Sequence, residues 1–189
     1  MSESSFAVAL VHYPILNRKG ERSTTAITSI DIHDFVRTCA MYDVGPVYMV
    51  HPAEGMHALV KDVAGYWLEG AGGERNPGRT ESIKSLKLAK SLEEVLSEED
   101  YTLWYTSATP PENEQEDVTK LPEKEGKHLI VFGTGSGLDY TEMPKPNGWL
   151  SPIEGIGMVR HLSVRAALAI YLDRLTQKRC QLGIEPMDG

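Results

Sequence analysis

Three closely spaced glycines follow a short apolar run at residues 129–138, LIVFGTGSGL. The run predicts a buried strand, and the glycines would let the backbone at its end approach a ligand closely. Backbone N–H and C=O groups would then do the binding. Three interpretations compete for this segment: a tight turn without a ligand, a dinucleotide site and a phosphate-binding Walker loop.

The residues around these glycines argue against the dinucleotide site and exclude the Walker loop. A dinucleotide fingerprint has the form Gly-x-Gly-x-x-Gly, with an acidic residue about 20 positions further on. Here the form is Gly-x-Gly-x-Gly, and although Glu154 lies near that distance, Pro144 and Pro146 interrupt the helix that should follow. A Walker loop is excluded because no Lys-Ser/Thr pair follows the glycines. The turn without a ligand stays open.

The segment 25–38, TAITSIDIHDFVRT, places Asp31, Asp34 and Arg37 three residues apart, near one face of a predicted helix. One interpretation is a solvated face with internal ion pairs. The other is that Arg37 points into a cleft and meets a phosphate or a reacting nucleotide, since arginine is the natural bidentate phosphate partner.

Two further segments carry candidate groups. Residues 74–82 hold Arg75, Asn76 and Arg79 beside glycines, which fits either a grip on an RNA backbone or a surface loop with incidental charges. The terminal helix carries three alanines, so another backbone could pack close to it; a well-packed terminal helix explains them equally well. They are Ala166, Ala167 and Ala169.

The sequence contains no motif typical of a metal site or of a hydrolase. No His or Cys pair has the spacing of a zinc site. The serine of GTGSG stands one position off the Gly-x-Ser-x-Gly elbow of hydrolases. We therefore expect neither a metal nor a hydrolase.

Composition indicates one soluble domain, residues 1–189, with flexible ends at 1–5 and 181–189. The net charge of −8 argues mildly against a polyanion partner, although basic residues cluster locally. No apolar run approaches the roughly 20 residues of a membrane span, and no signal peptide is visible, which predicts a cytoplasmic location. Cys39 and Cys180 fall in helix-like stretches, so we expect no disulfide.

The elements that must position these groups alternate between strands and helices, which predicts an α/β domain with a mainly parallel sheet flanked by helices. Strands are expected at 6–13, 44–50, 83–89, 101–105, 128–132 and 149–153, and helices at 30–42 (with Asp31 as N-cap), 52–67, 92–96 and 162–178 (with Ser163 as cap). Between them, residues 69–79 should be mobile or bound to a ligand, and 112–125 should form an acidic solvated loop.

Six segments, in order along nearly the whole chain, carry a family resemblance: ALVHYPI (9–15), TAITSIDIHDFVRT (25–38), NPGRTES (76–82), YTSA (105–108), LIVFGTGSGL (129–138) and RHLSVRAALAI (160–170). The chain resembles the SPOUT superfamily of RNA methyltransferases. More closely, it is similar to a small bacterial family of SAM-dependent RNA methyltransferase domains, sometimes fused to a tRNA (guanine-N1)-methyltransferase. The resemblance implies a C-terminal deep trefoil knot, a rare exception among protein topologies.

The resemblance also implies the cofactor, the partners and the site. S-adenosylmethionine would be held by loops 106–108, 133–138 and 150–163, and a homodimer would methylate RNA, in particular tRNA. The cofactor-binding residues would be Thr106, Ser107, Ala108, Gly133, Thr134, Gly135, Gly137, Leu138, Ser151, Pro152, Ile153, His161, Leu162, Ser163 and Ala167. Arg37 would be catalytic, and Arg75, Asn76, Arg79 and Arg165 would bind RNA.

One region departs from the family pattern. The ribose-methylating branch carries asparagines and a glycine before its arginine, where this chain has Ser29, Asp31 and Asp34. Base and ribose therefore both stay open as targets. Two rival functions are a non-catalytic SAM- or RNA-binding module that partners another methyltransferase, and an NAD-dependent oxidoreductase.

Overall fold

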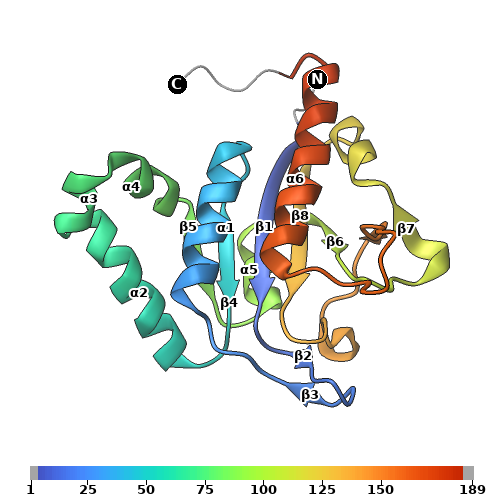
Figure 1. Cartoon of the computed structure of the whole chain (residues 1–189), viewed down its shortest axis with the longest axis horizontal. Helices are drawn as coiled ribbons and strands as arrows, with labels where there is room; N and C mark the ends of the chain where they lie inside the picture. The colour runs from blue at the N-terminus through green and yellow to red at the C-terminus, as the bar shows by residue number, and fades with distance from the viewer. Residues whose placement is uncertain (1–3, 185–189) are drawn as a thin grey trace.

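The computed structural model describes residues 4–184, and its seven main strands form one sheet in which every neighbouring pair is parallel (Figure 1). The strands are β1 (Ser5–Val11), β4 (Val47–Val50), β5 (Leu86–Ala89), β6 (Tyr101–Tyr105), β7 (Gln115–Glu116), β8 (Lys127–Gly133) and β9 (Gly148–Leu150). Their order across the sheet is β5-β4-β1-β8-β6-β9-β7. The expected α/β class with a parallel sheet is confirmed; the knot stays a prediction.

Strand β1 shows why the sheet has two buried faces. Successive side chains of a strand point to opposite faces, and all of Phe6–Val11 is apolar and buried. Phe6, Val8 and Leu10 join the core under the long helices, whereas Ala7, Ala9 and Val11 join a second, shallower core. A strand buried on both faces reads as a continuous apolar run.

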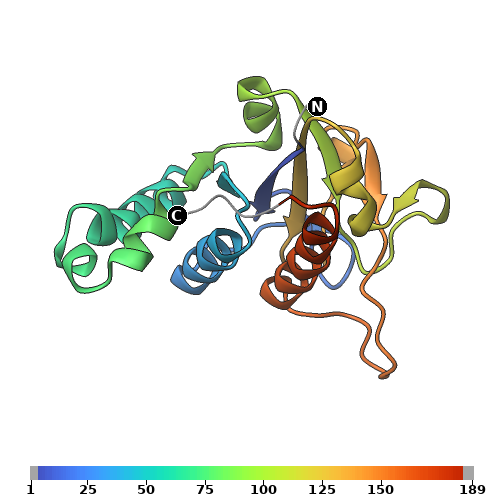
Figure 2. The same ribbon diagram turned by 90° about the horizontal axis from the view of Figure 1, so that it is seen from above.

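Helices cover the two faces unequally. The helices are α1 (Ser29–Met41), α2 (Glu54–Leu68), α3 (Ala71–Arg75), α4 (Pro77–Ile83), α5 (Leu92–Glu98) and α6 (Val164–Gln181). Figure 2 shows α1 and α6 side by side on one face and α5 on the other, with α2, α3 and α4 beyond the β5 edge. Short 3₁₀ turns are η1 (Glu112–Glu114), η2 (Val118–Glu123) and η3 (Tyr140–Glu142), and β2 (Ile15–Leu16) pairs with β3 (Arg22–Ser23) as an antiparallel hairpin.

The glycine-rich segment 69–79, which the sequence predicts to be mobile or bound to a ligand, is largely helical: it holds α3 and the start of α4. A Cβ on Gly72 would lie 2.5 Å from Cε1 of Tyr66 and 2.9 Å from Cε3 of Trp67. A Cβ on Gly73 would lie 2.5 Å from the carbonyl oxygen of Trp67. The glycines therefore allow the short helix α3 to pack directly on the last turn of α2.

Other differences from the sequence prediction lie at element boundaries. Thr28, not Asp31, is the N-cap of α1, and Asp31 is the third helical residue of a capping box in which each side chain accepts the other's backbone N–H. Strand β9 ends at Leu150, and β5 begins only at Leu86 because α4 continues to Ile83. The acidic region 112–125 holds η1, β7 and η2.

Some expectations concern the ends of the chain and the absence of sites. Residues 1–3 and 185–189 lie outside the described part, while Ser5 begins β1. Cys39 is buried and Cys180 exposed, and both are free. Among residues 4–184, no helix is long and apolar enough to cross a membrane. No group of three His, Cys, Asp or Glu side chains in that same range is placed to hold a metal ion.

Candidate functional site

Three neighbouring parallel strands end at the same edge of the sheet and deliver the three predicted loops there. Strand β8 leads into loop 133–138, β6 into loop 106–108 and β9 into loop 151–163, and these strands are adjacent in the order β8-β6-β9. Figure 1 shows the chain after β8 turning at the lower edge of the sheet, close to β2. Ligands of open α/β sheets bind outside the carboxyl ends of their strands, so the position suits a binding site.

Loop 133–138 is a tight turn held against the β2 strand. The backbone N–H of Ser136 donates to the carbonyl of Leu16 (2.9 Å), and that of Leu16 donates to the carbonyl of Gly137 (2.8 Å). Gly135 has a φ of +61°, and a Cβ there would lie 2.6 Å from Cδ1 of Ile15. The close approach that requires this glycine is thus to the protein's own chain. At Gly137 a Cβ would meet nothing within 4 Å.

Loop 106–108 is tied to the neighbouring strand at its first residue. Both the backbone N–H and the hydroxyl of Thr106 donate to the carbonyl of Val131, at 3.1 and 2.9 Å. The hydroxyl of Ser107 accepts the N–H of Thr109 (3.0 Å). With both side chains engaged locally, this loop would offer a ligand mainly its backbone and the exposed Ala108.

Loop 151–163 is anchored at both ends and exposed between them. Ser151 donates its N–H to the carbonyl of Glu116 (2.9 Å) and accepts the hydroxyl of Tyr171 (2.9 Å), and Ser163 caps α6. Residues 154–163 are exposed, and Ile156 and Met158 are fully so. Figure 2 shows this loop projecting from the body of the protein. Pro152, Ile153, His161 and Leu162 complete the predicted set here, whereas Ala167 packs against the core.

The two acidic residues of α1, Asp31 and Asp34, do not pair with Arg37 of the same helix. The guanidinium of Arg165, in the first turn of α6, contacts Asp31 (2.8 Å) and Asp34 (3.3 Å). The ion pairs therefore join α1 to α6 rather than lying within α1. Arg37 is exposed and forms no ion pair among residues 4–184.

Arg37 instead faces the side of α1 towards α2. The pKa of His33 is lowered, first by burial and then by the charges of Arg79 and Arg37. His33 also lies edge-on to Trp67, 5.6 Å between ring centres. It lines an open groove of about 410 Å³ between the two helices, together with Ser29, Asp62, Val63, Tyr66 and Trp67.

Of the four residues predicted to bind RNA, three lie together around the junction of α3 and α4, and Arg165 lies apart from them in α6. Asn76 is the N-cap of α4 and accepts the N–H of Arg79 (3.1 Å), while the guanidinium of Arg79 lies 4.9 Å from the ring centre of Trp67. Arg75 is exposed at the end of α3. Arg165 lies in the first turn of α6, and Figure 1 shows α6 on the other side of α1 from α3 and α4.

A buried polar cluster beneath the start of α1 was not predicted. His12, which follows β1, is 1% exposed, and its Nδ1 lies 2.9 Å from the hydroxyl of Thr25. That hydroxyl is hydrogen-bonded to the hydroxyl of Thr134 in loop 133–138. Burial lowers the pKa of His12 to about 4, although the nearby Asp31 opposes this shift. The sequence signal was a histidine directly after a buried strand, which spacing rules for metals do not detect.

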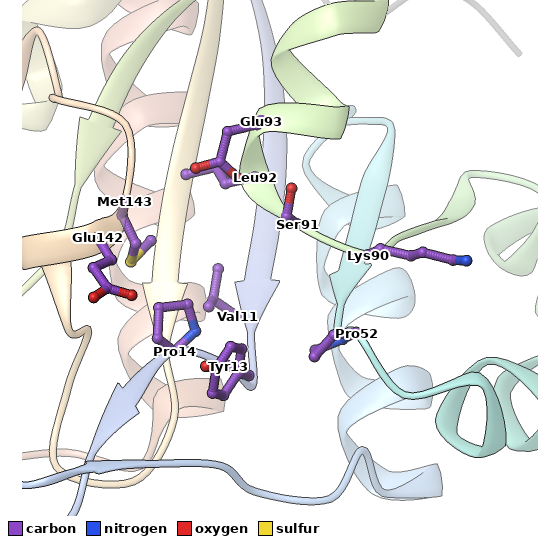
Figure 3. A pocket seen from close by; sticks show the side chains of 10 residues that line it. All are labelled: Val11, Tyr13, Pro14, Pro52, Lys90, Ser91, Leu92, Glu93, Glu142 and Met143. Carbon is purple, nitrogen blue, oxygen red and sulfur yellow. The ribbon is translucent and has the colours of Figure 1, made fainter.

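A smaller pocket lies on the α5 face of the sheet. Figure 3 shows Tyr13 and Pro14, beyond β1, opposite Ser91 and Leu92 at the start of α5. Its volume is about 170 Å³, and its one lysine, Lys90, is already paired with Glu54 at 2.6 Å. It contains no residue of the three loops.

The segment after loop 133–138 bears on the oxidoreductase alternative. A dinucleotide site needs a helix starting at its glycines. Here only the three-residue turn η3 follows, and the chain then runs through a proline-containing loop to β9. The structure contradicts that alternative.

Comparisons with known proteins agree with this geometry. A family profile described as SAM-dependent RNA methyltransferase matches residues 5–177. An uncharacterized protein of Aquifex aeolicus is 32% identical over 95% of this chain and 93% of its own. A tRNA (guanine-N(1)-)-methyltransferase of Oleidesulfovibrio alaskensis is 30% identical over 88% of this chain, which spans only 41% of that relative.

Solved structures share the fold at low sequence identity. The TrmH/SpoU tRNA modifying enzyme of Aquifex aeolicus superposes with a TM-score of 0.58 at 17% identity, covering 97% of this chain and 79% of its own. The SpoU methyltransferase AviRb of Streptomyces viridochromogenes, solved with AdoMet, superposes with a TM-score of 0.61 at 12% identity, covering 96% and 63%. These likenesses show that the chain shares its fold with the TrmH/SpoU enzyme and with AviRb.

Proposed function

The chain belongs to the family of SAM-dependent RNA methyltransferases, and from this premise we propose that it methylates a nucleotide of structured tRNA as a homodimer. The tRNA substrate is supported by the name of the Oleidesulfovibrio relative. Because this chain spans 41% of that relative, the guanine-N1 activity named there is not transferred to it. A cytoplasmic location belongs to the same proposal, since a tRNA substrate is found there.

The observation that carries the proposal is the meeting of three loops at one edge of the sheet. The edge offers an open backbone at Gly137 and exposed apolar side chains such as Leu162 and Val159, which suit a ligand with polar ends and a flat apolar ring. The residues present therefore fit S-adenosylmethionine. Bound there, this cofactor would supply a methyl group already activated by its sulfonium centre.

The fifteen predicted residues would share the binding in different ways. Backbone groups of loops 106–108 and 133–138 would contact the ligand, because the side chains of Thr106 and Thr134 are bound to neighbouring strands. Loop 151–163 would cover it with apolar side chains. Leu138 and Ala167 are packed into the protein and would support the site from behind.

Arg37 would bring the RNA to the cofactor. Its guanidinium is exposed and unpaired among the described residues, so it is available to donate hydrogen bonds to a phosphate or to orient the attacking group. Arg75, Asn76 and Arg79 lie together at the junction of α3 and α4, and α4 packs against α1, so these residues would form one RNA-facing surface with Arg37. Arg165 would contribute only if a phosphate competed with its two carboxylates.

The homodimer is supported by exposed apolar surface. Ile156 and Met158 are fully exposed in loop 151–163, and exposed apolar side chains that gather in one segment mark contact surfaces. Half-buried alanines on α6 would allow a second copy to pack closely. In such a dimer, Arg37 of one subunit would serve the cofactor held by the other. The trefoil knot is part of the same proposal.

Calorimetric titration of the purified protein with S-adenosylmethionine, with NAD as control, tests the cofactor. We expect saturable binding near one per subunit for the first and none for the second. Binding of NAD alone would reject the proposed cofactor.

Transfer of labelled methyl groups from S-adenosylmethionine to bulk tRNA tests the activity. Arg37→Ala should keep the cofactor affinity within about twofold and lose at least about tenfold in transfer, with Arg75→Ala as a milder control. Cofactor binding without transfer to any RNA would instead support the non-catalytic binding module.

A further inference from the structure

The hydroxyl of Thr134 joins the proposed cofactor loop to a buried chain of hydrogen bonds that the cofactor itself would not touch. Thr134 follows directly after β8 and donates its hydroxyl to the carbonyl of Val11 (3.2 Å). It is also bonded to the hydroxyl of Thr25, 109 residues away in sequence. Thr25 in turn meets Nδ1 of His12 at 2.9 Å. The chain thus connects the cofactor loop, the segment before α1 and the end of β1.

The direction of these bonds follows from the number of protons. A threonine hydroxyl has one proton to donate. Because that of Thr134 goes to the carbonyl of Val11, the proton between the two threonines belongs to Thr25. Thr25 must then accept from Nδ1–H of His12. The chain is complete only with a proton on Nδ1 of His12. Burial lowers the pKa of His12 and so favours the neutral ring, in which Nε2 is then bare. That atom is buried and has no hydrogen-bond partner in the described structure.

Loop 133–138 depends on this chain at its first half. Its second half is fixed by the β2 strand, through the bonds between Leu16 and both Ser136 and Gly137. Its first half is fixed by the N–H of Thr134 to Val11 (3.2 Å) and by the Thr134 hydroxyl. Without the hydroxyl of Thr25, the side chain of Thr134 would be held in its rotamer only by its 3.2 Å hydrogen bond to the carbonyl of Val11. The position of the open backbone at Gly137 follows from both halves together.

The first turn of α1, which follows this segment, is bonded to the first turn of α6, where the third loop ends. Asp31 accepts the hydroxyl of Thr28 (2.6 Å) and binds Arg165, two residues after the cap Ser163. Residues 25–31 are therefore hydrogen-bonded to both ends of the site, loop 133–138 and the start of α6. A shift of α1 would therefore move both loop 133–138 and the start of α6.

We propose that Thr25 and His12 are positioning residues, which hold Thr134 and thereby set loop 133–138 in its cofactor-binding arrangement. The proposal rests on the proposed cofactor site. Neither residue needs to touch the cofactor or the RNA; their effect passes through one hydroxyl to a backbone turn.

The chain offers a matched pair of threonines for the test. Thr25→Val keeps the shape of the side chain but removes the hydroxyl between His12 and Thr134. Thr24→Val removes the neighbouring hydroxyl, which donates to the carbonyl of His12 (3.1 Å) and contacts His51 but does not reach Thr134. Thr25→Ser restores the hydroxyl.

Calorimetry should show about tenfold weaker binding of S-adenosylmethionine to Thr25→Val, which corresponds to about 1.4 kcal/mol. Thr24→Val and Thr25→Ser should bind within about twofold of the wild type. Unchanged affinity in Thr25→Val, or an equal loss in Thr24→Val, would overturn the proposal.

Amide hydrogen exchange separates this proposal from the proposed function. In Thr25→Val the amides of Thr134 and Ser136 should exchange about tenfold faster than in Thr24→Val, with no cofactor present. If the wild type binds no S-adenosylmethionine, the cofactor site is wrong, and exchange alone decides whether Thr25 positions the loop. Equal exchange in the two variants would reject the positioning role.

Discussion

His12, at the end of the central strand, makes the stability of the protein depend on pH. Burial lowers its pKa from 6.5 to about 4, so the unfolded chain binds a proton more readily than the folded protein between those values. Stability should therefore fall as the pH falls through this window, by about 2 kcal/mol between pH 7 and pH 5 from this residue. Urea denaturation at the two pH values measures it.

The variant His12→Asn is the comparison for this measurement, because an amide can still donate to Thr25 but does not titrate. Its loss of stability between pH 7 and pH 5 should be smaller by that amount. Part of the slope should remain, since burial also lowers the pKa of His51 and His128. An identical slope in the two proteins would mean that the fold does not lower the pKa of His12.

The turn of loop 133–138 itself requires a glycine at position 135. Its φ of +61° is unfavourable for other residues, and a Cβ would lie 3.0 Å from the carbonyl oxygen of Leu16. We expect Gly135→Ala to lower the free energy of unfolding by about 1–3 kcal/mol. Gly155→Ala, in loop 151–163, has open space around its Cβ and should stay near zero. Thermal or urea unfolding of both variants checks this, and equal effects would contradict it.

At the scale of elements, the docking of α3 on α2 depends on Gly72. An alanine there would push a methyl group into the rings of Tyr66 and Trp67, so Gly72→Ala should destabilise the protein by about 1–3 kcal/mol. Gly78→Ala, in α4, meets only Oδ1 of Asn76 at 3.7 Å and should be neutral or stabilising by up to about 1 kcal/mol. Denaturant unfolding distinguishes the two, and a stable Gly72→Ala would show that α3 does not need this contact.

This helix also shows where sequence analysis reaches its limit. Apolar runs such as residues 6–11 and 128–132 predict strands well, because burial on both faces leaves no other pattern. Glycines predict loops from intrinsic propensity, yet at 71–75 the packing against Tyr66 and Trp67 overrides that propensity. Boundaries fail for a similar reason, since Thr28 and Asp31 are equally good caps until the helix start is known.

The candidate site likewise has features that the sequence predicts and features that it does not. The three loops could be predicted, because each follows an apolar strand and the resemblance orders them. The contact of Thr25 with Thr134 could not, since it joins residues 109 positions apart through a sheet whose strand order is not written in any local pattern. Nor could the separation of Arg37 from Asp31 and Asp34, which depends on where α6 begins.

At the scale of the whole molecule, the proposed dimer has a direct test. Replacing Ile156 and Met158 together by Asp should yield a monomer in light scattering, while the free energy of unfolding of each subunit changes by less than about 0.5 kcal/mol, because both side chains are fully exposed. Glu154→Lys changes the charge of the same loop without removing apolar surface and should leave the dimer intact. A dimer that persists in the double variant would place its interface elsewhere.

The position of β8 in the sheet has a consequence for how the chain folds as it is synthesised. Its residues pair on one side with β1, in the register Ser5 with Lys127, and on the other side with β6. Until residue 133 has been made, the strands of this sheet already present form three separate groups, β5-β4-β1, β6 and β7, because β8 and β9 join them. Contacts between residues so far apart in sequence slow folding, so the nascent chain must keep its apolar β1 edge protected until β8 has been synthesised.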